Sequence, residues 1–269
     1  MEQKLSKKTR TESDLIGSRE VPESALYGVQ TLRGIENFRI SKFHLNEYPL
    51  FIQALAITKM GAAVANRELD LLTEEQTDAI LKACKEILEG KHHDQFPVDM
   101  IQGGAGTTTN MNANEVIANR ALELMGHARG EYQYCSPNDH VNRSQSTNDA
   151  YPTAIHIGLY YTHLKLVKHF ATLIEAFRKK GAEFAHIIKM GRTQLEDAVP
   201  MTLGQTFNGF ASILEHELKN LDFAAQDFLT VNMGATASEP ELPPNRNMRK
   251  SALLPCARLP DWISNWQMT

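Results

Sequence analysis

The chain has 269 residues, of which 42% are hydrophobic, and a formal net charge of -4 at pH 7. This composition supplies enough apolar material for a sizeable core, and the lack of a basic face or run argues against nucleic-acid binding. The three cysteines lie far apart in the sequence, which indicates neither a disulfide framework nor a zinc site and is typical of a reducing cytoplasm. No apolar run reaches the length of a signal-peptide core or a membrane span, so we expect a soluble cytoplasmic protein with no membrane partner.

The first half of the chain contains two segments with clear helical signals. Residues 1–46 show no sustained period, and we expect an arm with turns and short pieces there. From Pro49 onward, apolar residues recur at every third or fourth position, which predicts a helix. Thr73 and Gln76 form a capping box at the start of a second helix, and Gly90 supplies its left-handed stop.

The first of three polar stretches runs from Gln102 to Val116, with the sequence Q-G-G-A-G-T-T-T-N-M-N-A-N-E-V. It predicts a glycine loop followed by a helix that reaches Leu124. Asn110 and Asn114 are one turn apart, so at least one should lie on the inner face within a polar network. The loop either binds a ligand or only caps the helix, and this stretch alone does not decide between the two.

The second polar stretch, Val141 to Thr153, opens the longest predicted helix. Residues 146–149 are suited to cap it, and Pro152 is expected in its first turn. A leucine repeats every seven residues for about three heptads, which is typical of a helical bundle. His163 lies on this seam, and we interpret it as a hydrogen-bonded core or interface residue rather than a catalyst.

The third polar stretch, Gly191 to Gln205, precedes a second very long helix whose apolar stripe runs from Leu203 to Phe228. We expect each polar stretch to lie at the mouth of a helix, where a small anion can be held. Two helices with such stripes cannot bury them alone, so we expect an oligomer. Residues 238–269 hold five of the eleven prolines and both tryptophans, which is not typical of a bundle helix.

The sequence lacks the familiar catalytic and cofactor motifs. It has no G-x-S-x-G elbow, no H-E-x-x-H pair and no dinucleotide fingerprint, so we predict no cofactor. His92 and His93 follow a helix end and are expected in solvent, so we also predict no metal. The polar stretches instead supply neutral hydrogen-bond donors, namely Thr107, Thr108, Ser146, Thr147, Asn148, Thr193 and Gln194.

Neutral donors at helix N-termini suit one kind of chemistry. They bind carboxylates, and they stabilise a carboxylate whose negative charge grows during reaction. Removing a proton next to a carboxylate creates such a dianionic species. The donors therefore fit an elimination across a carbon–carbon bond beside a carboxylate, which also requires a base and a cation.

The three polar stretches resemble the first three substrate-binding regions of the fumarase/aspartase superfamily. The resemblance runs from about Asp14 to Ala237 and includes the segment from Tyr27 to Phe38. Within the superfamily the sequence is more similar to the aspartate ammonia-lyases than to the class II fumarases. The fumarase pattern has S-S-N-D in the second region and T-H-L-Q-D-A-T-P in the third, where this chain has S-T-N-D and T-Q-L-E-D-A-V-P.

The resemblance implies a fold, an activity and a set of roles. It implies an all-α fold, a long-helix bundle with a small helical N-terminal domain (1–144), the start of the central bundle (145–237) and an unrelated tail (238–269). It implies reversible elimination of ammonia from L-aspartate to give fumarate, in a homotetramer. Thr107, Ser146 and Thr147 would hold the β-carboxylate, Asn148, Thr193 and Gln194 the amino group, and Arg33 would support the site from behind.

One departure from the family pattern is large. The family's later loop, G-S-S-I-M-P-A-K-V-N-P, carries the serine base and the lysine and asparagine for the α-carboxylate, and it does not occur here. We therefore expect a truncated or frame-shifted chain, with an incomplete C-terminal end, no identifiable base and little activity of its own. The alternatives are a class II fumarate hydratase and a non-catalytic helical oligomerisation fragment.

Overall fold

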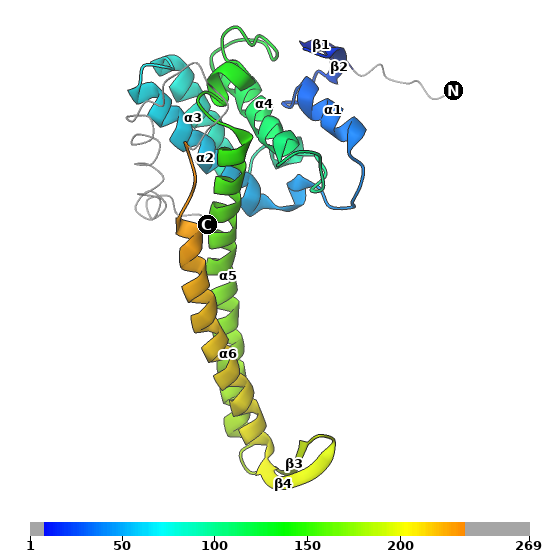
Figure 1. Ribbon diagram of the computed structural model, residues 1–269, viewed down its shortest axis with the longest axis vertical. Helices are drawn as coiled ribbons and strands as arrows, with labels where there is room; N and C mark the ends of the chain where they lie inside the picture. Colours follow the sequence, from blue (N-terminus) through cyan, green and yellow to red (C-terminus); the bar gives the residue numbers. More distant parts are fainter. Residues whose placement is uncertain (1–7, 235–269) are drawn as a thin grey trace, which may run out of the picture. The chain divides into compact units, whose positions relative to one another are not determined.

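The computed structural model describes residues 8–234, which divide into two units (Figure 1). Among the described residues, the first unit comprises residues 8–158 and 230–234, and the second comprises residues 159–229. The division falls inside one long helix. The predicted domains 1–144 and 145–237 stay predictions, and the predicted tail 238–269 lies outside the described residues.

The first unit begins with a two-stranded antiparallel hairpin where an irregular arm was expected. Strand β1 (Thr9–Asp14) pairs with β2 (Gly17–Pro22). Of the β1 side chains only that of Glu12 is buried, so the strand lacks the alternation of apolar and polar residues that predicts a strand from sequence. Strand β1 is polar on both faces, and β2 buries only one apolar side chain, that of Val21, which is why the arm prediction was wrong here.

Helix α1 (Val29–Asn37) follows, and two buried carboxylates hold its N-terminus. Glu115 accepts the backbone N–H groups of Gly28, Gln30 and Thr31 at 2.8, 2.8 and 3.0 Å. Glu12 accepts the N–H of Val29 at 2.9 Å. Four amides that a helix N-terminus leaves without partners are thus all satisfied by acidic side chains, which the helix dipole also favours.

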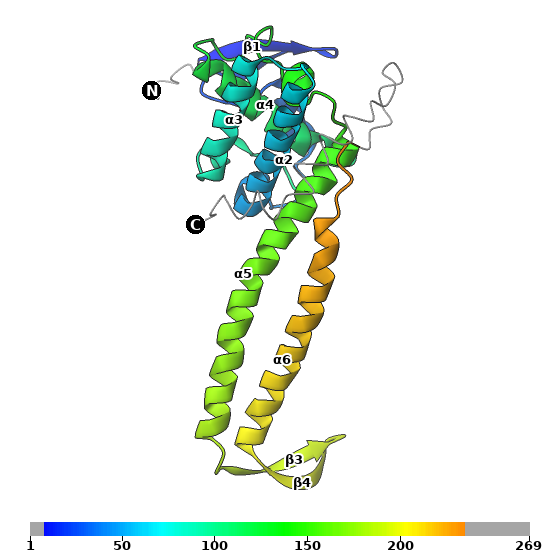
Figure 2. The ribbon, with the colours of Figure 1, turned by 90° about the vertical axis from the view of Figure 1, so that its left-hand side faces the viewer.

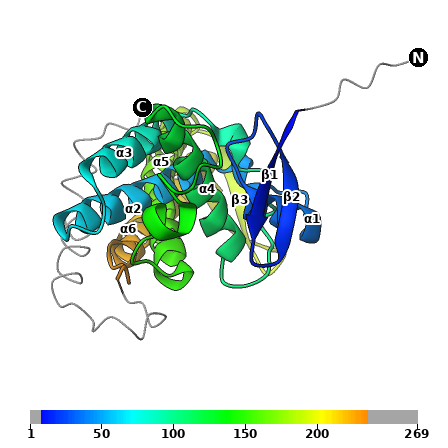
Figure 3. The ribbon, with the colours of Figure 1, turned by 90° about the horizontal axis from the view of Figure 1, so that it is seen from above.

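Three helices, α2 (Pro49–Glu68), α3 (Glu74–Leu88) and α4 (Thr107–Leu124), build the core of the first unit (Figure 3). Both predicted starts are confirmed, because Pro49 is the first residue of α2 and Thr73 and Gln76 form the capping box of α3. Gly90 has the expected left-handed conformation, with φ +85°. On these three helices, the largest fully buried apolar side chains are Ile52, Leu55, Met60, Ile80, Ile87, Ile117 and Leu122.

Short turns connect these helices: η1 (Leu45–Glu47), η2 (His93–Gln95) and η3 (Pro137–Val141), the last a single π-type turn. An ion pair joins α3 to α4, with Arg120 donating to Glu86 at 2.5 and 2.8 Å. This bidentate pair holds the pKa of the Glu86 carboxyl at about 2. The two helices are therefore fixed by charge as well as by apolar packing.

Helix α5 (Thr147–Glu183) begins in the first unit and continues through the second. It has 37 residues, and Pro152 is the sixth of them rather than part of the first turn as expected. Because proline has no N–H, the Asn148 carbonyl lacks its usual helical donor. The side chain of Asn232 replaces that donor, at 2.9 Å.

The second unit is a helical hairpin with a β-hairpin between its helices. Strands β3 (Ile188–Thr193) and β4 (Glu196–Thr202) are antiparallel, and α6 (Leu203–Ala225) then runs back beside α5 (Figures 1 and 2). The turn η4 (Gln226–Leu229) ends the unit. Phenylalanines 177, 184, 207 and 210 pack between the two helices, with ring centroids 5.5–6.2 Å apart.

The heptad leucines of α5 are not covered by α6. Leu159, Leu166 and Leu173 are 44, 39 and 44% exposed, whereas His163 is buried and bonds to Asp222 of α6 at 2.8 Å. The interface role predicted for His163 is confirmed. Among the described residues, no helix has the length and hydropathy needed to cross a membrane.

Candidate functional site

Five of the seven predicted donors lie at the starts of two helices in the first unit. Thr107 and Thr108 are the first two residues of α4, Ser146 immediately precedes α5, and Thr147 and Asn148 open it. For these two polar stretches, the predicted position at the mouth of a helix is confirmed. Whether these residues bind a substrate stays a prediction at this point.

The start of α4 is shaped by a glycine loop. Gly106 has φ +84°, and a Cβ atom there would collide with the ring of Tyr151 in α5, so only glycine fits. The Gln102 side chain fastens the loop to the helix, donating to Thr109 Oγ1 at 2.6 Å and accepting the Thr109 N–H at 2.8 Å. Within residues 8–234, the amides of Thr107 and Thr108 have no acceptor, so they remain available to an anion.

Ser146 and Asp149 cap the start of α5. The Asn148 N–H donates to Ser146 Oγ at 3.2 Å, and the Ser146 N–H donates to Asp149 Oδ1 at 3.0 Å. Asp149 is fully buried and also accepts the Gly234 N–H at 3.1 Å. Burial raises the pKa of Asp149, and the N–H donors and Lys59 oppose that rise.

A buried polar network joins the two helix starts. Asn110 Nδ2 donates to Thr147 Oγ1 at 3.2 Å and to Asn142 Oδ1 at 3.1 Å. Asn114 Nδ2 also donates to Asn142 Oδ1, at 3.1 Å. The predicted polar network on the inner face of α4 is confirmed, since both asparagines are buried.

Lys59 of α2 lies at the centre of this network. It is 0% exposed, and its Nζ donates to Asn110 Oδ1, Asn142 Oδ1 and Gln145 Oε1 at 2.7, 3.0 and 2.9 Å. Burial lowers the pKa of Lys59 to about 7, which the charge of Asp149 opposes. Sequence reasoning missed this residue, although one signal was present: Lys59 is the only charged residue between Pro49 and Asn66.

A cavity of about 450 Å³ lies between the glycine loop and the start of α5. Of the predicted donors, only Asn148 lines it. The other lining residues come from positions 100–106 and from the first turns of α5, namely Met100, Ile101, Gln102, Gly104, Ala105, Gly106, Tyr151 and Pro152. The cavity is large enough for a small dicarboxylate, and it opens beside the free amides of α4.

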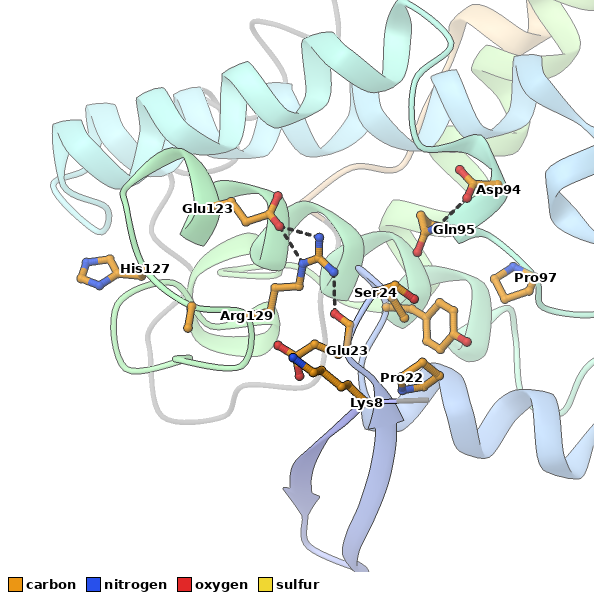
Figure 4. A pocket seen from close by; sticks show the side chains of 13 residues that line it. Lys8, Pro22, Glu23, Ser24, Asp94, Gln95, Pro97, Glu123, His127 and Arg129 are labelled. Carbon is orange, nitrogen blue, oxygen red and sulfur yellow. Dashed lines mark hydrogen bonds and ion pairs between the residues drawn. The ribbon is translucent and has the colours of Figure 1, made fainter. Parts of the chain in front are cut away.

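A larger cavity, of about 950 Å³, lies elsewhere in the first unit and contains none of the predicted donors (Figure 4). Its main cation is engaged, because Arg129 bonds to Glu123 at 2.6 Å and to the Glu23 carbonyl at 2.6 Å. Asp94 likewise accepts from Gln95, at 2.6 Å. Arg129 is thus already paired with an acidic side chain, and the cavity lies apart from the predicted donors.

The remaining two donors, Thr193 and Gln194, lie in the second unit and not at the mouth of a helix. Thr193 ends β3, and Gln194 and Leu195 form the hairpin turn, with φ 50° and 67°. Helix α6 starts only at Leu203, capped by Thr202. The predicted helix-mouth position was therefore wrong for Thr193 and Gln194, because strand pairing of residues 188–202 precedes the helix. The end of the same stretch does lie at a helix start, since Thr202 and Gln205 form the capping box of α6. A proline and a glycine within the strands obscured the strand pattern.

Arg33 bonds to the β-hairpin. Its guanidinium donates to both carboxylate oxygens of Asp14 at 2.8 Å and to the Gly17 carbonyl at 2.7 Å. This pair lowers the pKa of Asp14. Its predicted role behind the substrate site stays a prediction.

The histidines that follow α3 are engaged by neighbours. His92 contacts Glu86 at 2.9 Å, and His93 bonds to the Ile87 carbonyl at 2.8 Å. Within residues 8–234, no group of three or more His, Cys, Asp or Glu side chains is arranged to hold a metal ion. Between the two helix starts, the buried polar groups are instead those of the network around Lys59.

A family model described as lyase matches residues 17–251. The chain belongs to the lyase family. The resemblance to the fumarase/aspartase superfamily is thereby confirmed, as is the mostly helical fold.

Curated relatives of this lyase chain are aspartate ammonia-lyases. The enzyme of Pseudomonas fluorescens is 58% identical over 229 residues, which is 85% of this chain and 48% of the relative. That of Escherichia coli K12 is 55% identical over 234 residues, or 87% of this chain and 49% of the relative. The chain therefore spans about half the length of the curated relatives it matches.

Solved structures of lyases share the fold. A fumarate lyase/delta crystallin from Brucella melitensis has a TM-score of 0.87 at 46% identity, covering 94% of this chain and 56% of that one. A class II fumarase from Schistosoma mansoni has a TM-score of 0.84 at 32% identity, covering 97% and 55%. Identity is higher to the aspartate ammonia-lyases than to the fumarase.

Proposed function

We propose that this chain carries the first substrate-binding segments of an aspartate ammonia-lyase, a carbon–nitrogen lyase that converts L-aspartate into fumarate and ammonia. The observation that supports it is the joining of the α4 and α5 starts through the bond from Asn110 to Thr147, next to a cavity of about 450 Å³ that Asn148 and the glycine loop line, in a chain 58% identical to such an enzyme. Thr107, Ser146 and Thr147 would receive the β-carboxylate, with Thr108 as a further substrate-binding residue. Asn148, Thr193 and Gln194 would receive the amino group.

The chemistry assigns each group a physical task. A base removes a proton from Cβ of L-aspartate, and the electron pair delocalises into the β-carboxylate as an aci-carboxylate dianion. The bond between Cα and nitrogen then breaks, so that the double bond of fumarate forms and ammonia leaves. Neutral donors held in place before reaction stabilise the dianion more than the substrate, and each is worth about 3–4 kcal/mol in comparable sites. The reaction needs no cofactor.

The base belongs to a motif that residues 1–269 do not contain. We therefore assign binding to this chain and expect little turnover from it alone, since loss of general-base catalysis costs about 10²–10⁴-fold in rate.

Assembly is part of the proposal. The exposed leucines of α5 and the exposed Phe210 and Ile213 of α6 leave an apolar surface on the second unit. Such a surface is typical of a helical bundle completed by further copies. We propose a homotetramer, located in the cytoplasm.

The test is ligand binding by purified 1–269, with fumarate and L-aspartate as titrants in a calorimeter. We expect both to bind, Thr107→Val and Thr147→Val to weaken binding about tenfold, and the exposed Thr172→Val to leave it unchanged. L-malate in place of L-aspartate distinguishes the fumarase alternative. No binding of any of the three dicarboxylates at millimolar concentration would contradict the proposal, and so would rapid fumarate release from L-aspartate by the chain alone.

A further inference from the structure

The orientation of the Asn110 side chain is dictated by its neighbour Lys59. A lysine ammonium has three donors and no acceptor, so it must face the oxygen of an amide. Asn110 Oδ1 accepts from Lys59 at 2.7 Å, and this leaves Nδ2 facing Thr147 Oγ1 at 3.2 Å. The two ends of one amide thus link a buried cation to a hydroxyl at the start of α5.

The direction of this last bond matters for Thr147. When its oxygen accepts from Asn110, its own proton points elsewhere and is available as a donor. If the Asn110 amide were reversed, its oxygen would face Thr147 and take that proton. The Thr147 hydroxyl would then donate its proton to Asn110 and could not donate it to a ligand.

We propose that Lys59 is a positioning residue for substrate binding: it fixes the Asn110 amide so that the Thr147 hydroxyl keeps its proton for a carboxylate of the ligand. This inference rests on the proposed function, which assigns Thr147 to the β-carboxylate. It adds a residue of α2 that touches neither the ligand nor the reacting atoms.

The surroundings of Lys59 support a specific role. Its three acceptors are neutral amides from two other segments, so it carries a buried charge without a directly bonded carboxylate. Holding such a charge away from water is costly, as the pKa of about 7 indicates. An apolar side chain of similar length would fill the same space at lower cost, and it would leave the Asn110 amide free to reverse.

The sharpest test replaces the Nδ2 group of Asn110, which donates to Thr147, with an acceptor. Asn110→Asp keeps the shape and neutralises Lys59, but it presents an acceptor to Thr147, which then turns its proton inward. The variant also loses the bond from Nδ2 to Asn142 Oδ1, and the new ion pair with Lys59 offsets that loss in stability. We expect Asn110→Asp to unfold in urea at no lower concentration than the parent chain and to bind fumarate about tenfold more weakly. A merely structural role for Asn110 would not separate these two measurements.

A double-mutant cycle with Thr147→Val removes the general effect of an added negative charge. We expect Asn110→Asp to weaken fumarate binding in the parent chain and to have no further effect in Thr147→Val. Asn142→Asp is the matched control, because it adds the same charge beside Lys59 but its side chain has no bond to Thr147 in the structure. Its effect should be the same in both backgrounds.

Lys59→Met provides a second route if Asn110→Asp does not fold. It should also weaken fumarate binding about tenfold, again only when Thr147 is present. Additive effects of Thr147→Val with both variants would overturn this inference alone. Absence of fumarate binding by the parent chain, or full binding by Thr147→Val, would overturn it together with the role that the proposed function gives Thr147.

Discussion

Gly106 illustrates how much one residue contributes to the start of α4. Two requirements coincide there: a left-handed backbone with φ +84° and contact with the Tyr151 ring. Gly90 meets only the first, with φ +85° and no atom within 4 Å of a built Cβ. The two glycines therefore separate backbone strain from steric collision.

We predict that Gly90→Ala lowers the free energy of unfolding by about 1 kcal/mol, the usual cost of a left-handed alanine. Gly106→Ala should cost about 1–3 kcal/mol more, because the Tyr151 ring must move as well. Urea unfolding of both variants measures the difference. In a chain that already carries Tyr151→Ala, Gly106→Ala should lower the free energy of unfolding by about as much as Gly90→Ala does in the parent chain. If Gly106→Ala still costs more than Gly90→Ala in that background, the explanation is contradicted.

At the scale of elements, helix α1 depends on a carboxylate from another helix. Glu115 of α4 satisfies three amides at the N-terminus of α1, and burial raises its pKa to about 7, against the opposing effect of those hydrogen bonds. Its ordinary pKa is 4.5. Between these values the folded chain holds a proton that the unfolded chain releases, so the stability contribution of Glu115 falls as pH rises.

We predict that the stability difference between the parent chain and Glu115→Gln depends on pH. Glutamine cannot release a proton, so the advantage of the parent chain should be largest near pH 4.5 and decline by on the order of 3 kcal/mol by pH 8. Urea unfolding at several pH values measures this. A constant difference for Glu115→Gln would show that the carboxyl does not titrate in this range.

The elements also show which signals in the sequence were informative. The starts of α2 and α3 were predicted because Pro49 and the Thr73–Gln76 capping box are local features. The two β-hairpins were missed because β1 is polar on both faces and β4 contains Pro200. The role of Lys59 in the buried network was missed because its partners come from residues 110–145. A local sequence pattern does not predict contacts between residues so far apart in the chain.

At the scale of the whole molecule, the exposed leucines of α5 predict association. Leu166 lies at the centre of the three heptad leucines and is 39% exposed. We predict that light scattering of the protein eluting from a size-exclusion column gives a mass of several chains. Leu166→Asp should reduce this mass, because association would bury its charge without a partner. Thr172→Asp makes the same charge change on the same helix and should leave the mass unchanged. A monomeric parent chain would contradict the proposed assembly.

The beginning of α5 receives hydrogen bonds from residues made much later. Gly234 and Asn232 donate to Asp149 and to the Asn148 carbonyl, which precede them by 85 and 84 positions. During translation the first turn of this helix leaves the ribosome while both donors are still unmade. Its final bonds therefore form only after α6 has been synthesised, and a ribosome that pauses within α6 holds Asp149 in a state where that carboxylate is still unpaired with the amide of Gly234.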